Sequence, residues 1–287
     1  MISRAQRIAA AFKWACLAEL EAPKPGNVHV FAAGHRMTAD QFVASAEAAA
    51  GPLSASGTRV GVRILGAVDA TFAAVGVNSN LGIILLCAPL AAAGDADGGD
   101  LRPALAQVMR NLDTEDAALA FRAIARAAPA GLGRSARHDV FEPATVSLLQ
   151  AMTEAADRDR IARQYATDFA DVFEIGLPLF EAAAKRHTDL KWATLATYLG
   201  FLSAFPDSHV VRKRGEKTAA EVRQTAAAFQ ASLQAIKYPV ELLPKLLTWD
   251  ATLKANGINP GTSADLTVAA LFAHRVRNIL PSVRNSG

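Results

Sequence analysis

Four short polar segments carry the residue types in this sequence that could do chemistry, and each is marked by glycine or proline. They read ELEAPKPGNVHVFAAGHR (19–36), GVNSNLG (76–82), PDSHVVRKRG (206–215) and NGINPGTSADLTVAALF (256–272). Lysine, asparagine and two histidines on the first segment can bind phosphate and titrate near neutral pH. We therefore treat the four segments as candidate parts of a functional site.

The later segments offer complementary groups. Backbone N–H groups at the start of a helix near residue 81 would attract an anion. Asp207, His209 and Arg212 place a carboxylate, an imidazole and a guanidinium within six positions, which is enough to hold a metal-bound phosphate. Asp265 follows a Gly-Thr-Ser sequence and could hold Mg²⁺ through water.

Each segment also has a structural interpretation. The first is a rigid connector after a helix. Asn80 and Asp207 can cap the helices that follow them, and Asn259 followed by Pro260 is a strong helix start. Asp265 then lies in a first helical turn, where a carboxylate is favourable on electrostatic grounds alone. No single segment decides between the two interpretations.

The elements that must position these residues are predicted to be helices. Alanine makes up about a fifth of the 287 residues, far above its ordinary usage, and it costs least in a helix. Alternating strand patterns are nearly absent, so the sequence predicts an all-α fold of about ten helices in one globular domain over residues 1–287. The expected helices cover 3–21, 38–51, 58–75, 81–93, 101–111, 114–128, 144–155, 159–187 with a break near 176–178, 189–204, 216–237, 240–255 and 262–279.

Charge and hydropathy exclude other classes. The 30 basic and 27 acidic residues give a net charge of +3 without a basic stripe, so nucleic acid is not an expected partner. The most apolar run, 81–93, is shorter than the roughly 20 residues of a membrane span, and we expect a buried helix in a cytoplasmic protein. Cys16 and Cys87 lie far apart without a CxxC pattern, which argues against a disulfide framework or a zinc site.

Taken in order, the four segments resemble the triphosphoribosyl-dephospho-coenzyme A synthase family. The matching stretches are APKPGNVH (22–29), GVNSNLGIILLCAPLA (76–91), FPDSHVVRKRG (205–215) and NPGTSADLTVAALF (259–272). Asn27 and His29 stand where lyase-associated members have Leu and Asp, and Asn80 with Leu81 replaces a His-Lys pair. These departures are more similar to the branch found in methanogens and methylotrophs, whose members accompany tetrahydromethanopterin-linked one-carbon metabolism.

The resemblance implies a transferase that displaces adenine from C1′ of the ATP ribose with a hydroxyl acceptor, and that uses Mg²⁺ with ATP. It implies catalytic and metal-binding roles for Glu19, Asp207 and Asp265. The residues expected to bind substrate are Lys24, Asn27, His29, His35, Asn78, Asn80, His209, Arg212, Lys213, Asn259 and Ser263.

Two alternatives stay open at this point. One is a related ribosyl-transfer or coupling enzyme in tetrahydromethanopterin- or methylofuran-linked cofactor synthesis. The other is a nucleotide-binding protein without catalysis. The expected partners are ATP and a small cofactor-precursor acceptor, and the apolar helix faces also suggest a homodimer.

Overall fold

The computed structural model describes residues 2–32, 38–77, 79–96, 99–127, 133 and 137–280. Two predicted substrate-binding residues, His35 and Asn78, lie outside these ranges. Within them the chain forms helices and no strand, which confirms the predicted all-α class. The elements are α1 (Arg4–Glu21), α2 (Ala39–Ser54), α3 (Val60–Val75), α4 (Leu81–Asp95), α5 (Leu101–Arg110), α6 (Thr114–Ala127), α7 (Leu148–Ala155), α8 (Arg160–Ala166), the π-helix η1 (Val172–Gly176), α9 (Leu177–Arg186), α10 (Leu190–Ala204), α11 (Ser208–Arg214), α12 (Glu216–Ala235), the 3₁₀-helix η2 (Pro239–Leu242), α13 (Leu243–Ala255) and α14 (Gly261–Val276).

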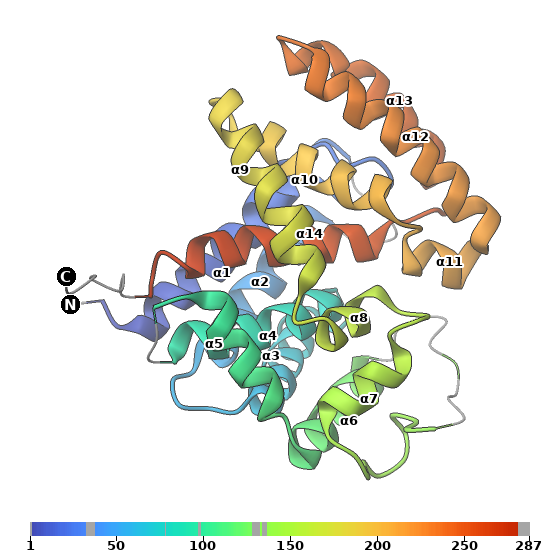
Figure 1. Ribbon diagram of the computed structural model, residues 1–287. Helices are drawn as coiled ribbons and strands as arrows, with labels where there is room; N and C mark the ends of the chain where they lie inside the picture. The colour runs from blue at the N-terminus through green and yellow to red at the C-terminus, as the bar shows by residue number, and fades with distance from the viewer. Residues whose placement is uncertain are drawn as a thin grey trace.

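Helix α14 lies at the centre of the molecule and packs against α1, α4 and α10 (Figure 1). Helices α4 and α10 are apolar on nearly every side and are buried accordingly. Phe12 of α1 meets Phe272 of α14 edge to face at 5.9 Å between ring centroids. The prediction that 81–93 forms a buried core helix is therefore confirmed.

Helix α2 begins with a capping box at Thr38 and Gln41, in which each side chain is bonded to the other residue's backbone N–H. The predicted end of this helix near residues 51–52 was wrong, because α2 continues through Pro52 to Ser54. Pro52 sits in the last turn, where a proline costs less than in the middle of a helix.

The described ranges hold the α-helices α1 to α14, more than the sequence predicts. The long helix predicted over 159–187 is instead α8, the π-helix η1 and α9. The chain bends at Asp168 and Phe169, which both have positive φ. The seven-residue α11 adds another short helix between Asp207 and Gly215. Short helices of this kind carry little periodicity, so pattern reading merges or misses them.

Helices α12 and α13 run beside each other at one edge of the molecule (Figure 1). Phe229 of α12 and Trp249 of α13 stack with their ring centroids 5.0 Å apart. This pairing places α13 next to the loop that follows α1, where Lys254 of α13 donates to Ala32 O at 3.1 Å.

None of the described helices is both long enough and apolar enough to cross a membrane.

Candidate active site

The beginnings of α4, α8, α11 and α14 meet at one place. A methyl group on Gly82 of α4 would overlap the Asp265 carboxylate of α14 and the side chain of Ile161 of α8. Ser208 of α11 contacts Thr262 of α14 through their hydroxyls at 2.9 Å. The two long helices among these, α4 and α14, turn their positive ends toward the shared region, which favours a bound anion there.

Asp207 joins two of these helices. Its Oδ1 accepts the backbone N–H groups of His209 and Val210 at 3.0 and 3.1 Å, which caps α11. Its Oδ2 accepts from Ser263 N and Ser263 Oγ at 2.7 and 2.8 Å. Burial raises the pKa of Asp207, while the donated N–H and hydroxyl groups lower it. Both carboxylate oxygens are already occupied inside the protein, so Asp207 shapes the site through Ser263 and α11.

Asp265, unlike Asp207, is not tied up by hydrogen bonds. Its side chain has no hydrogen-bond partner among the described residues. Burial raises its pKa well above the usual range, and the nearby carboxylates of Glu19, Asp207 and Asp159 raise it further. Arg212 is the cation that opposes them. This carboxyl group therefore keeps its proton to a higher pH than an ordinary aspartate does.

Glu19 and Lys24 form a fully buried ion pair at the end of α1, with Oε1 and Nζ 2.6 Å apart. Lys24 Nζ also donates to Val28 O at 2.6 Å. Burial raises the pKa of Glu19 and lowers that of Lys24, and each partner opposes the shift of the other. Glu19 Oε2 is buried without a hydrogen-bond partner. Lys24 was predicted to bind phosphate. In the structure its ammonium group is instead bonded to Glu19 and to Val28 O in the following loop.

The Lys-Pro-Gly loop reaches two other predicted residues. Asn27 is half-buried and donates through Nδ2 to Asn259 Oδ1 at 2.9 Å. His29 is buried, and its Nε2 lies 3.3 Å from Asp250 Oδ2. Asn27 and Asn259 thus form an amide pair that links the first and fourth polar segments.

Arg212 is the least satisfied cation of the site. Its Nη1 donates to Asp159 Oδ2 at 3.4 Å, and its Nε is buried without a hydrogen-bond partner. A guanidinium carries five donors in a fixed fork, and one carboxylate at 3.4 Å does not saturate its terminal Nη donors, which could therefore bind an anion. Lys213, the next residue, is exposed.

The other predicted residues take supporting positions. The His209 ring packs on Gly261, where an added methyl group would lie 3.1 Å from Nδ1. Asn80 is buried at the N-cap of α4, makes no side-chain cap bond, and donates through Nδ2 to Ser45 O at 3.4 Å. The predicted N-cap of the last helix was one residue off, because Pro260 and not Asn259 holds that position.

The three carboxylates predicted to bind metal come close enough for Glu19 and Asp207 to affect the pKa of Asp265. Within the described residues, however, no three His, Cys, Asp or Glu side chains are arranged to hold a metal ion. Asp207 is saturated by hydrogen bonds and Glu19 is paired with Lys24, so Asp265 is the carboxylate of the three whose two oxygens are both unoccupied.

Sequence reasoning missed four residues that shape this region. Asp159 caps α8 and contacts Arg212, and Tyr198 donates to Pro25 O at 2.7 Å. Asp250 and Lys254 contact the loop after α1. The last two stand at i and i+4 on a predicted helix, a pattern that normally marks an exposed surface pair.

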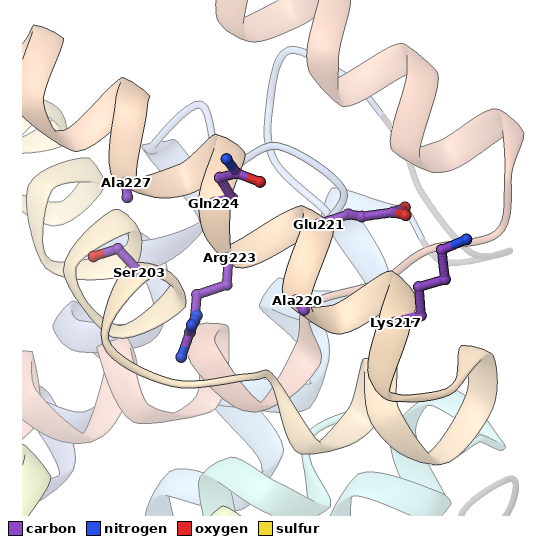
Figure 2. Close-up of a pocket in the computed structure, with 7 residues that line it drawn as sticks. All are labelled: Ser203, Lys217, Ala220, Glu221, Arg223, Gln224 and Ala227. Atoms are coloured by element: carbon purple, nitrogen blue, oxygen red, sulfur yellow. The ribbon is translucent and has the colours of Figure 1, made fainter.

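A surface pocket of about 480 Å³ lies between α10 and α12 (Figure 2). Its lining includes Ser203, Lys217, Glu221, Arg223 and Gln224. None of the predicted site residues lines it, so the candidate site rests on the side chains gathered at the helix beginnings.

The fold and these groups place a carboxyl without a hydrogen-bond partner among the described residues and an arginine paired with one carboxylate at the meeting point of four helices of an all-α protein. Residues 5–283 match the family described as ATP:dephospho-CoA triphosphoribosyl transferase, and the chain belongs to that family and is a transferase. It is similar to a protein of solved structure from Archaeoglobus fulgidus that is assigned as a triphosphoribosyl-dephospho-CoA synthase. The two are 27% identical, with a TM-score of 0.63 over 81% of this chain and 97% of the other. No curated protein matches the sequence.

Proposed function

We propose that this transferase moves the triphosphoribosyl group of ATP to a hydroxyl of dephospho-CoA and releases adenine. The observation that carries the proposal is Asp265, a carboxyl group without a hydrogen-bond partner among the described residues and close to Arg212. A hydroxyl nucleophile needs a proton acceptor, and the triphosphate needs cations. Family membership supports catalysis over simple nucleotide binding.

In the proposed reaction the acceptor oxygen forms a bond to C1′ as the C1′–N9 bond to adenine breaks. The hydroxyl proton passes to Asp265, and adenine leaves with a proton from solvent or from an acid of the site. Such a displacement passes through an oxocarbenium-like transition state, which nearby carboxylates stabilise. The raised pKa of Asp265 brings it closer to that of a base working near neutral pH.

Arg212 and Lys213 would hold the triphosphate, together with the positive ends of α4 and α14. Of the three carboxylates predicted to bind metal, only Asp265 is unoccupied among the described residues. Such a site fits a Mg²⁺ held mainly by phosphate oxygens and water. Asp265 would contact such an ion through water, and the ion would neutralise phosphate charge. Mg²⁺, the cytoplasmic location and the homodimer remain predictions.

The direct test is adenine release, measured by chromatography after incubation with Mg-ATP and dephospho-CoA. We expect one adenine per acceptor consumed and a triphosphate retained on the product. Omitting the acceptor is the control and should give no release. Binding of ATP without release would contradict dephospho-CoA as acceptor. That result would favour a precursor of a tetrahydromethanopterin- or methylofuran-type cofactor, as the Asn27 and His29 departures suggest.

Arg212→Ala should weaken Mg-ATP binding by about 10- to 100-fold, since a hydrogen bond to a charged group contributes about 1.5–3 kcal/mol. Isothermal titration calorimetry measures this. The matched control is Arg214→Ala, because Arg214 is exposed and donates to Gly257 O at 3.2 Å. Equal affinities in the two variants would remove Arg212 from the proposed site.

A further inference from the structure

We infer that Asp250 of α13 is a positioning residue of the transfer site, because it holds the turn whose Asn27 pairs with Asn259, just ahead of α14. This inference rests on the function proposed above. Asp250 is 3% exposed and lies 224 residues from the turn in sequence. It belongs to none of the four polar segments.

The first contact is to the backbone of the turn itself. Gly26 N donates to Asp250 Oδ1 at 2.8 Å, and the neighbouring Pro25 O accepts from Tyr198 of α10 at 2.7 Å. The peptide group between these two residues is thus hydrogen-bonded to α10 through its C=O and to α13 through its N–H. Lys24 immediately precedes it and Asn27 immediately follows.

The turn is also packed closely against its neighbours. Gly26 has φ of +82°, a conformation that glycine adopts without strain. A Cβ at Gly26 would lie 2.8 Å from Pro260 Cδ and 3.0 Å from Leu253 Cδ1. The backbone of the turn therefore packs directly on the segment that leads into α14.

The charge of Asp250 is balanced within the same cluster. Its Oδ2 accepts from Lys254 Nζ at 2.9 Å and lies 3.3 Å from His29 Nε2. Burial alone raises the pKa of Asp250, yet hydrogen bonds from His29, Lys254 and Gly26 bring it below the usual value. The pKa of His29 is lowered by burial, and Lys254 and Lys24 add to this shift. Asp250 is therefore an anion at neutral pH with Lys254 as its main cation.

The two carboxylate oxygens of Asp250 therefore have different roles. Oδ1 sets the position of the turn through the Gly26 N–H, and Oδ2 contributes stability through Lys254. Asp250→Ala removes both roles. Asp250→Asn retains an oxygen that can accept the Gly26 N–H and loses the charge that pairs with Lys254. The two variants should therefore differ in activity more than in stability.

The experiment measures the melting temperature, kcat/KM for adenine release and Mg-ATP affinity on the full-length chain. The matched control is Asp116→Ala. Asp116 is also 3% exposed, accepts a glycine N–H (Gly61) at 2.8 Å and pairs with an arginine, Arg59, between α3 and α6. We expect all three variants to melt at lower temperature. Asp250→Ala should lose at least about tenfold in kcat/KM and in Mg-ATP affinity, as expected when a positioning contact is lost.

Asp116→Ala should stay within about twofold of the parent in both quantities, because its contacts lie away from the turn. Asp250→Asn should recover most of the activity while its melting temperature stays low. If activity follows melting temperature across all variants, or if Asp250→Ala remains fully active, the inference is overturned. A parent protein that binds Mg-ATP but releases no adenine would instead count against the proposed reaction, and the affinities would still test the role of Asp250.

Discussion

Replacing Asp265 by asparagine is expected to slow adenine release by about 100- to 10 000-fold, the usual contribution of a general base. Asparagine has the same shape but cannot take the proton of the attacking hydroxyl. The substitution also removes a carboxylate whose ionisation is made costly by burial and by three neighbouring acids. The variant should therefore be at least as stable as the parent. Single-turnover rates and thermal melting measure the two effects.

The pH profile gives a second readout of the same group. The base must be deprotonated to act, so the rate of the parent should rise with pH through the raised pKa of Asp265. Asp265→Asn should lose this rise. Asp100→Asn is the control, because Asp100 caps α5 with its side chain and an asparagine can still cap. A variant at position 265 that keeps the parent's rate and pH profile would exclude Asp265 as the base.

The second large effect is on stability. Lys24→Met should lower the free energy of unfolding by about 3–5 kcal/mol, because it leaves the Glu19 carboxylate buried without its cation. Without Lys24 the pKa of Glu19 rises further, and ionised Glu19 then destabilises the folded state. The loss should therefore be greatest at neutral and alkaline pH. It should shrink as the pH falls toward the ordinary pKa of glutamate, where the group is protonated in both states. Urea unfolding at several pH values measures this.

A double variant tests whether the unpaired buried charge causes the loss. Glu19→Gln with Lys24→Met removes both charges, so most of the lost stability should return. The matched control is Lys13→Met in the surface pair with Glu47, whose Nζ and Oε2 are 3.0 Å apart and whose side chains are 37% and 56% exposed. Exposed pairs of this kind contribute about 0–1 kcal/mol. A double variant no more stable than Lys24→Met alone would show that the pair is not the source of the loss.

Local features of this protein follow from its sequence. The capping box at Thr38 and Gln41, the buried apolar helix α4 and the all-α class depend on interactions within one or two helical turns. The four polar segments could also be found from the sequence, because glycine and proline mark the turns in which they lie. The amide pair of Asn27 with Asn259 shows that two of these segments do meet.

What each polar side chain does was decided by the tertiary structure. Lys24, Asp207 and Asp265 look equally available in sequence, yet Lys24 is paired with Glu19 and Asp207 with Ser263, and Asp265 has no such partner among the described residues. Asp250 and Lys254 resemble a surface pair until α13 packs on a turn more than two hundred residues away. Burial and partners of this kind depend on which helices pack together. The local sequence does not contain that information, because the desolvation that shifts a pKa or leaves a carboxyl unpaired comes from distant segments.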